Sequence, residues 1–309
     1  AKRAAAAWGA SAGCAAAAAS AAGRAARSGK VQQRRRALAA ATQEMLSEAD
    51  VRAVRELRGL LERAGLGGAP LSLLQRCCKA AANDVQAAFA EARSIVRWRE
   101  SKEVDRILDD ALAASDERWY RGLLCYGLPG LDRRGRAVMI EAVGQWDMDE
   151  LDEAVRSRKD DMLRSHIFVC ERLLAEAGRA AAHHGGGYQQ SADLSVRAPG
   201  FVAVLDMDGI SLKQNLLSYP QLLRTLREIS QINARYYPEA VEHVFVVNTP
   251  RVFETIWRLV APFVLPSSGV KVDVLRRGDF RKLVTECGRA CLPVQLGGTL
   301  PSQTPPYQV

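Results

Sequence analysis

Residue types that catalyse reactions or bind metals occur in this chain, but not in the patterns that such chemistry needs. The stretch GASAG at 9–13 matches the G-x-S-x-G nucleophile motif, yet it lies in an alanine tract without the flanking strand and helix. The seven cysteines include no C-x-x-C pair, and the histidines of HHGGG at 183–187 lack a third metal ligand. The sequence therefore predicts no enzyme, no cofactor and no metal site, and it favours free thiols over disulfides.

A polar turn followed at once by an apolar run is the most distinctive local pattern. Residues 233–250 read NARYYPEAVEHVFVVNTP, with two adjacent tyrosines and a Pro-Glu pair just before VFVV. A strand that is apolar on both faces belongs in the middle of a parallel sheet covered by helices. Pro238 cannot continue a helix, so the helix before it must end there. The pattern predicts a central strand over 243–249.

The elements that must position this turn fall into two groups along the chain. Helical spacing of apolar residues predicts a small bundle that ends near Asp116, with helices at 47–64, 70–79, 83–99 and 102–113. Beyond it, the sequence predicts strands at 135–144, 201–207, 243–249 and 270–275 and a short fifth element at 292–298. Between them it predicts helices at 151–177, in the segment that ends at about Arg235, and at 251–264. This alternation predicts an α/β fold with a mostly parallel sheet.

The helix predicted at 251–264 is apolar over most of its circumference. Ile256 and Val260 belong to one apolar face, and Phe253 and Trp257 extend the apolar surface around the helix. A helix of this kind is normally buried on all sides. The alternative is a helix that covers an apolar cavity and meets a membrane when it moves. The sequence leaves both interpretations open.

Charge is distributed unevenly along the chain of 309 residues. Eight of the 43 basic residues and no acidic one lie within 1–43, so the remainder carries 35 basic residues against 35 acidic ones. This Ala-rich tail has too few large apolar groups to form a core. It fits an organelle-targeting peptide or a linker from a longer protein. The net charge of +8 thus belongs to the tail, which predicts weak attraction to anionic membranes and no nucleic-acid partner.

The order of several motifs resembles the CRAL-TRIO lipid-binding domain family, which includes the phosphatidylinositol/phosphatidylcholine transfer proteins. These motifs are YYPE, a strand ending in VNTP, an F-x-x-x-W helix ending in APF, a lysine on the next strand, and LP-x-x-x-GG. The likeness covers 236–298 and continues upstream through LDMDGI at 205–210, GLDRRGRAV at 130–138 and the pair Trp98–Arg99.

The resemblance implies an αβα sandwich with a mostly parallel sheet floor, helical walls and a gate helix, preceded by a small helical N-lobe. The predicted division is a basic tail or linker over 1–46, the N-lobe over 47–115, the lipid-binding domain over 116–300 and a C-terminal tail over 301–309. The gate would be the apolar helix at 251–264, with Phe253, Ile256, Trp257 and Val260 facing the lipid or the membrane.

The resemblance also implies a headgroup site. In family members that bind phosphatidylinositol, the Glu of YYPE contacts inositol hydroxyls, and this residue is Glu239. The Lys that opens the strand after the gate, here Lys271, reaches the phosphate, and a hydroxyl residue three positions earlier, here Ser268, assists it. All three chemical types are present in this sequence.

Two departures from the family pattern narrow the expected ligand. Ala81 and Ala82 stand where phosphatidylinositol binders carry a basic pair, and Lys79 is nearby. Phe201, Ala203 and Met139 stand where phosphatidylcholine binders carry hydroxyls and a tyrosine. The phosphate would lose hydroxyl donors and the choline an aromatic face, so we expect phosphatidylcholine to be excluded and a more hydrophobic second ligand to be accepted.

These features predict a monomeric protein that binds one lipid, phosphatidylinositol, in an apolar pocket and transfers or presents it between membranes. No apolar run is long enough to span a bilayer, so membrane contact is expected to be peripheral, on a cytoplasmic protein, with organelle targeting by the tail left open. The alternatives are a lipid-sensing regulatory module of a larger protein, which does not transfer lipid, and a carrier of another hydrophobic ligand.

Overall fold

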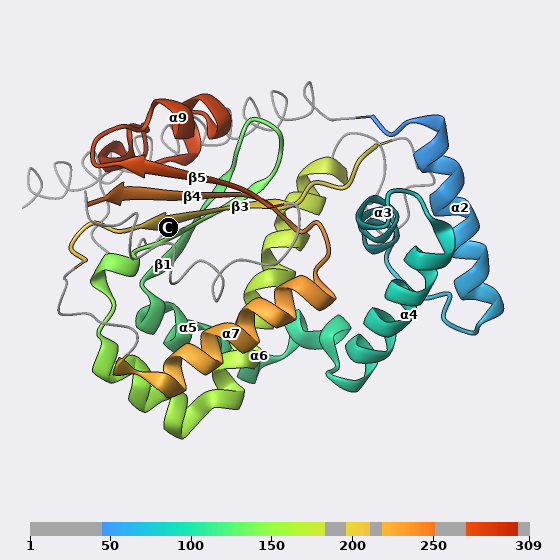
Figure 1. The fold of residues 1–309 in the computed structure, drawn as a ribbon, viewed down its shortest axis with the longest axis horizontal. Coiled ribbons are helices and arrows are strands. Elements are labelled where there is room, and N and C mark those ends of the chain that lie inside the picture. The colour runs from blue at the N-terminus through green and yellow to red at the C-terminus, as the bar shows by residue number, and fades with distance from the viewer. Residues whose placement is uncertain (1–44, 183–195, 211–217, 251–269, 302–309) are drawn as a thin grey trace, which may run out of the picture.

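The computed structural model describes residues 45–182, 196–210, 218–250 and 270–301. Three helices form the N-lobe at one end of the molecule (Figure 1): α2 (Glu48–Arg63), α3 (Leu71–Ala80) and α4 (Val85–Ser101). Their apolar stripes meet in one core that includes Leu57, Leu74 and Ile95. The helices predicted at 47–64, 70–79 and 83–99 are confirmed.

The helix predicted at 102–113 is wrong. The chain instead forms a 3₁₀ helix, η1 (Val104–Asp109), and then α5 (Ala111–Leu124). The reason is Asp110, whose carboxylate accepts hydrogen bonds from the backbone N–H groups of Leu112 and Ala113 and so begins a new helix. The expected boundary near Asp116 lies inside α5.

A sheet of five strands occupies the other end of the molecule. In spatial order the strands are β1 (Tyr126–Leu131), β2 (Ala137–Glu141), β3 (Phe201–Asp206), β4 (Val241–Thr249) and β5 (Lys271–Arg276). Strand β1 pairs antiparallel with β2, and the other neighbours pair parallel. The mostly parallel α/β sheet is therefore confirmed. The segment at 292–298 contains only a 3₁₀ turn, η5 (Val294–Leu296).

Helices cover the sheet on both sides. The connections α6 (Met148–Ala182) and α7 (Pro220–Tyr236) lie with α5 on one side, and α9 (Arg281–Cys287) lies on the other (Figure 1). Helix α6 connects β2 to β3 and α7 connects β3 to β4, and both pairs of strands are parallel neighbours. Because such crossovers are right-handed and both progress in the same direction along the sheet, the two helices lie on the same side. Side chains alternate accordingly, so Val202 and Val204 pack towards Leu283 of α9, and Phe201 packs towards α5–α7. None of the described helices is long and apolar enough to cross a membrane.

Candidate functional site

Aromatic contacts join the N-lobe to the sheet domain. The indole of Trp98, near the end of α4, stacks on the ring of Tyr236 with centroids 4.0 Å apart and planes 4° from parallel. Tyr237 meets the same indole edge-on at 6.0 Å. Aromatic pairs in such arrangements stabilise a contact by about 0.5–1.5 kcal/mol beyond the area they bury. The two tyrosines of YYPE therefore hold the N-lobe against the start of β4.

A buried ion pair lies beside these rings. The guanidinium of Arg99 donates to both carboxylate oxygens of Glu171 on α6, at 2.7 and 3.1 Å, and its Nε donates to Asp105 at 2.8 Å. The hydroxyl of Tyr237 donates to Glu171 at 2.9 Å. Because this two-pronged geometry needs the planar fork of an arginine, it fixes orientation as well as distance. The pairs Trp98–Arg99 and Tyr236–Tyr237 together form what we call the lobe clamp.

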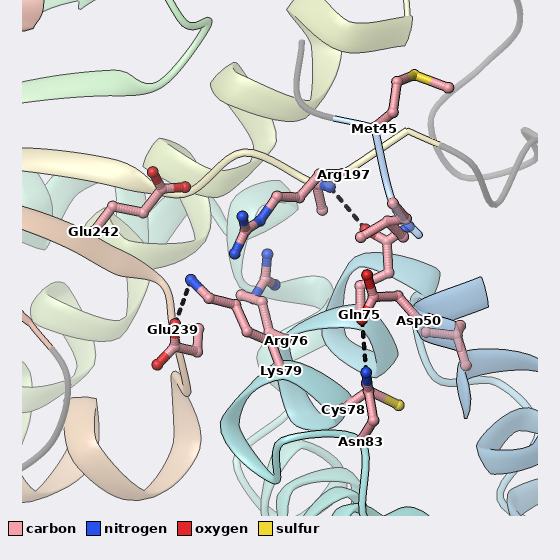
Figure 2. A pocket seen from close by; sticks show the side chains of 13 residues that line it. Met45, Asp50, Gln75, Arg76, Cys78, Lys79, Asn83, Arg197, Glu239 and Glu242 are labelled. Atoms are coloured by element: carbon pink, nitrogen blue, oxygen red, sulfur yellow. Dashed lines mark hydrogen bonds and ion pairs between the residues drawn. The ribbon is translucent and has the colours of Figure 1, made fainter. Parts of the chain in front are cut away.

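A polar pocket, which we call the lobe-junction pocket, opens beside the clamp between α3 and the segments that precede β3 and β4 (Figure 2). Its cavity volume is about 90 Å³, enough for several water molecules. Glu239 lies in its wall, in the left-handed region at φ 52°, and its carboxylate is 2.5 Å from the ammonium of Lys79. Charged residues lining the pocket are Asp50, Arg76, Lys79, Arg197, Glu239 and Glu242.

The other carboxylates of the pocket have protein partners. Asp50 accepts a hydrogen bond from Asn83 at 2.6 Å and others from Ser47, and these bonds lower the pKa of Asp50. Glu242 accepts one from the backbone N–H of Gly200 at 2.8 Å. The wall opposite α3 is held by Gln75, which donates to the carbonyl of Val196 and accepts from the N–H of Ala198. The pocket is thus a built polar site with fixed walls.

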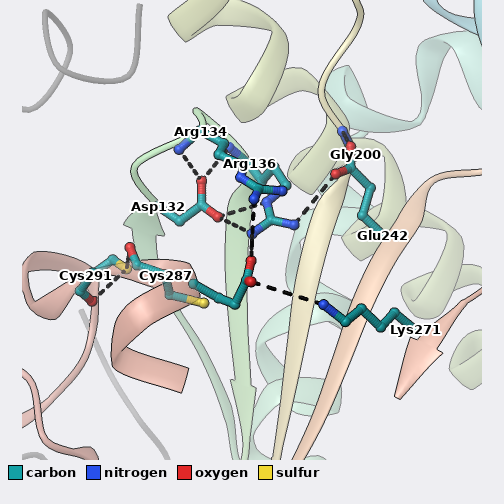
Figure 3. Close-up of polar contacts among 10 residues, drawn as sticks. Asp132, Arg134, Arg136, Gly200, Glu242, Lys271, Cys287 and Cys291 are labelled. Atoms are coloured by element: carbon teal, nitrogen blue, oxygen red, sulfur yellow. Dashed lines mark hydrogen bonds and ion pairs between the residues drawn. The ribbon is translucent and has the colours of Figure 1, made fainter. Parts of the chain in front are cut away.

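Lys271 lies outside this pocket. It begins β5 on the side that faces α9, its side chain is 55% exposed, and its ammonium is 4.0 Å from Glu286 (Figure 3). It sits at the edge of a buried cluster in which Arg136 donates to Asp132 at 2.7 Å and approaches Glu242 at 3.5 Å. Glu242 therefore connects the cluster to the lobe-junction pocket, and no ion pair joins Lys271 to Glu239.

The three positions expected to exclude phosphatidylcholine lie on one side of the sheet. Met139 of β2 and Ala203 of β3 are direct neighbours in the register, and Ala203 neighbours Val244 of β4. These residues belong to an apolar cluster that also contains Leu205, Met207, Val246, Val270 and Val272. Phe201 packs instead into the core beneath α5–α7. Its five central members are each at most 9% exposed, so the cluster is buried, and within the described part of the chain it draws no member from α5, α6 or α7. We call it the apolar sheet face.

Sequence reasoning missed one residue beside the apolar sheet face. Glu141 follows Met139 by two positions on β2, so its side chain lies on the same side of the sheet. It makes no hydrogen bond or ion pair with any residue that the structure describes, and burial raises its pKa to about 8. The sequence VMIE at 138–141 contained the signal, because Glu141 stands two positions after Met139, a predicted ligand-binding residue, and alternate residues of a strand face the same side.

The remaining predicted site residues lie outside the described ranges. These are Ser268 and the four residues of the predicted gate, Phe253, Ile256, Trp257 and Val260. The grouping of Glu239, Ser268 and Lys271 into one headgroup site therefore stays a prediction, as does the gate. Arg76 and Arg197, which line the pocket beside Glu239, were not predicted at all.

Comparisons with known proteins find chains that are similar to this one. The SEC14 cytosolic factor of Eremothecium gossypii is 28% identical over 270 residues, which are 85% of this chain and 80% of that protein. The phosphatidylinositol/phosphatidylcholine transfer protein SFH4 of Arabidopsis thaliana is 27% identical over 67% of this chain and 31% of its own length. The crystal structure of Sfh5 shares 20% identity over 67% of this chain and 68% of its own, with a TM-score of 0.48.

The family assignment rests on the sheet domain. The model of the CRAL/TRIO domain matches residues 122–298, which is more than half of the chain and includes all five strands. The resemblance that the motifs around YYPE indicated is therefore confirmed. The chain belongs to the CRAL/TRIO domain family.

Proposed function

We propose that the protein binds one phosphatidylinositol molecule and transfers it between membranes, without chemical change to the lipid. The observation that carries the proposal is the apolar sheet face, a buried apolar cluster on β2–β5. Moving an acyl chain from a bilayer to water costs about 0.8 kcal/mol per methylene, so a carrier must offer the chain an apolar surface. The name of the relative from Arabidopsis thaliana, a phosphatidylinositol/phosphatidylcholine transfer protein, supports a role of this kind.

The lobe-junction pocket is the proposed place of the inositol headgroup. Glu239 accepts hydrogen bonds from inositol hydroxyls, and Lys79, which already pairs with it, supplies a positive charge close to where Ala81 and Ala82 replace the usual basic pair. Lys271 is exposed and has one carboxylate neighbour at 4.0 Å, so its ammonium can turn towards a phosphate. Ser268 is proposed to assist it.

The residue types on this side of the sheet are also the basis for proposing that phosphatidylcholine is excluded. Met139, Ala203 and Phe201 offer neither hydroxyl donors for its phosphate nor a tyrosine ring for its choline. We propose a more hydrophobic molecule as the second ligand. The carrier acts as a cytoplasmic monomer that touches membranes only at their surface, with the helix at 251–264 as its gate.

A second candidate function has one observation in its favour. SFH4 of Arabidopsis thaliana is matched over only 31% of its length, so a module of this kind occurs within longer proteins. In such a protein the module could sense a lipid and regulate an attached domain. A transfer assay separates the two functions, because a sensor holds its lipid when acceptor vesicles are added.

The experiment that tests the proposal identifies the lipid and then removes its headgroup contact. Native mass spectrometry of the purified protein should show one bound phosphatidylinositol. Glu239→Gln should lower phosphatidylinositol transfer between vesicles at least tenfold, because a hydrogen bond to a charged acceptor is worth about 1.5–3 kcal/mol. Glu153→Gln, at an exposed position of α6, is the matched control. A wild-type protein that carries no inositol lipid would overturn the proposal.

The gate has its own test. Trp257→Asp should slow lipid exchange much more than it lowers the melting temperature if the helix at 251–264 moves against the membrane. A helix of the buried core would instead lose several kcal/mol of stability on receiving an unpaired charge. Parallel loss of transfer and of stability would assign the helix to the core.

A further inference from the structure

A carboxyl group interrupts the apolar sheet face. Glu141 ends β2, and the sheet register places it between Tyr126 of β1 and Leu205 of β3. Leu205 belongs to the apolar sheet face, and Met139 precedes Glu141 on the same side of the sheet. A polar group among apolar side chains is unfavourable unless it is hydrogen-bonded, and Glu141 has no such partner in the described ranges. The position therefore calls for a polar group from a ligand.

The carboxyl of Glu141 can be reached and is mostly neutral at pH 7. The side chain keeps an intermediate accessible fraction, so a ligand can touch it. Burial raises its pKa to about 8, whereas a carboxyl in contact with bulk water would be ionised at this pH. A neutral carboxyl donates one hydrogen bond and accepts others, and an ionised one only accepts. Glu141 is thus a hydrogen-bond donor on an otherwise apolar surface.

The hydroxyl of Tyr120 on α5 is a second polar group on this side of the sheet. Tyr120 is 3% exposed, and its hydroxyl lies 3.5 Å from Nδ1 of His166, whose Nε2 is 2.8 Å from Oδ1 of Asn233. Burial lowers the pKa of His166, so its ring is neutral at pH 7. Because the amide oxygen can only accept, the hydrogen-bond network assigns the ring proton to Nε2, and Nδ1 accepts from the tyrosine. The oxygen of Tyr120 is left able to accept a hydrogen bond.

Glu141 and Tyr120 lie near each other without a direct bond in the described part of the chain. The ring of Tyr126, the register partner of Glu141, meets the ring of Tyr120 edge-on at 6.0 Å. Burial, and after it the carboxyl of Glu141, raise the pKa of Tyr120. The hydroxyl of Tyr126 is already engaged, since it donates to Glu117 at 2.6 Å. A donor and an acceptor that do not meet can be bridged by a hydroxyl group, which accepts and donates at once.

We propose that Glu141 and Tyr120 bind the hydroxyl of an uncharged apolar alcohol whose hydrocarbon part lies on the apolar sheet face. Glu141 donates to the ligand oxygen, and the ligand hydroxyl donates to the oxygen of Tyr120. The neighbours Met139, Leu205 and Tyr126 carry no charge that would hold a phosphate. This inference rests on the proposed second, more hydrophobic ligand, and it names the chemical class of that ligand. A straight-chain alcohol and a sterol share the required chemistry.

The test compares alcohols with hydrocarbons of the same shape. The full chain is incubated with phosphatidylcholine vesicles that contain oleyl alcohol or cis-9-octadecene, and then cholesterol or 5-cholestene. The protein is isolated again, and the retained molecule is quantified by mass spectrometry. A surface without a partner for the hydroxyl would prefer the hydrocarbon, because an alcohol gives up hydrogen bonds when it leaves the membrane surface. Retention of oleyl alcohol identifies a straight-chain alcohol as the ligand, and retention of cholesterol identifies a sterol.

Variants connect the retained alcohol to the two side chains. Glu141→Leu should lower the ratio of retained alcohol to retained hydrocarbon at least about tenfold, because the ligand hydroxyl loses a buried partner. Tyr120→Phe removes the acceptor oxygen and should lower the ratio at least about threefold. Glu153→Gln, at an exposed position of α6, should change it by less than about twofold.

The pH dependence separates a ligand contact from a structural role. An apolar ligand that covers an ionised carboxylate removes its water, so the ligand prefers protonated Glu141. With a pKa of about 8, alcohol binding should fall about tenfold between pH 7 and pH 9. The other titratable groups around Glu141 stay neutral, because burial raises the pKa values of Tyr120, Tyr126 and Cys125. Glu141→Gln keeps a donor and cannot ionise, so its alcohol binding should be equal at both pH values.

Two results would overturn the proposal. The first is that the wild type retains neither alcohol, or that the ratio is unchanged in both Glu141→Leu and Tyr120→Phe, which would leave only water between the two groups. The second is alcohol binding by the wild type that is equal at pH 7 and pH 9. If Glu141→Leu fails to fold, the pH comparison of the wild type with Glu141→Gln decides alone.

The outcome is independent of the test of phosphatidylinositol transfer, because none of the four probes contains phosphate or inositol. A protein that transfers phosphatidylinositol but does not select an alcohol refutes this proposal alone. A protein that selects an alcohol but carries no inositol lipid refutes the transfer proposal alone.

Discussion

Glu141 should make the stability of the protein fall as the pH rises. Burial raises its pKa from the ordinary value of 4.5 to about 8, so between these values the folded protein binds a proton that the unfolded chain releases. The stabilisation is fully present below pH 4.5 and is lost as the pH approaches 8. A pKa difference of one corresponds to about 1.4 kcal/mol. Raising the pKa from 4.5 to about 8 therefore contributes at most about 5 kcal/mol to the free energy of unfolding, and this contribution is lost by pH 8. Glu141 is only partly buried, and contact with water would reduce this figure.

The groups that face Glu141 do not titrate in the same window. Tyr120 of α5 and Tyr126 of β1 have pKa values raised by burial above the ordinary value of 10, and burial also raises the pKa of Cys125 above 9. All three stay neutral from pH 5 to 8. Burial also lowers the pKa of His166 from its ordinary value of 6.5. Its contribution is the same in the wild type and in a variant at Glu141, so it cancels in the difference.

The assay is urea unfolding of Glu141→Gln and of the wild type at several pH values from 5 to 8. The amide keeps the size of the side chain and cannot ionise. The variant should match the wild type within about 1 kcal/mol at pH 5 and exceed its free energy of unfolding by about 2–4 kcal/mol at pH 8. Glu153→Gln, exposed on α6, should show no such divergence. Parallel pH profiles for Glu141→Gln and the wild type would refute the reasoning and show Glu141 to be ionised in contact with water.

Three further predictions follow from the fold and the tail. Arg99→Lys keeps the charge of the lobe clamp but not its fork, so it leaves the mostly buried carboxylate of Glu171 with fewer hydrogen bonds. It should lower the free energy of unfolding in urea by about 2–4 kcal/mol. Gly144→Ala should cost at least about 2 kcal/mol, because its Cβ would lie 2.2 Å from the carbonyl oxygen of Asp208, whereas Gly122→Ala meets no atom within 4 Å and should cost nothing. Deletion of 1–43 should reduce binding to anionic vesicles at low salt without changing the melting temperature; a lower melting temperature would show the tail to be structural.

Periodicity was sufficient to predict the elements with strong patterns. The N-lobe helices and the strands β2–β5 have clear helical or apolar runs, and each was predicted within a few residues. Strand β1, with the sequence YGLPGL, was not predicted, because two glycines and a proline weaken the sequence pattern of a strand. The proline is tolerated because β1 lies at the edge of the sheet and pairs with β2 alone. The break at Asp110 was missed because a capping side chain overrode a continuous apolar pattern.

The site was only partly predictable, because its partners come from distant segments. The motif likeness identified Glu239 and Lys271 but not their neighbours, since ion pairs to Lys79 and to Glu286 depend on how the lobe and α9 pack. Arg76 belongs to none of the motifs that indicated the family, and its spacing of three residues from Lys79 is typical of a solvent-exposed helix face. Only the fold brings the segment with Arg197 against α3 and so reveals a buried charge.

The lobe junction contains two buried arginines whose surroundings are opposite, and the contrast indicates what each does. Arg99 has carboxylates on both sides and a tyrosine hydroxyl beside them, so its charge is compensated within the protein and holds the lobes together. Arg76 has no such compensation, so its burial costs stability that the clamp offsets. A residue that costs stability at a fixed interface is expected where binding requires it.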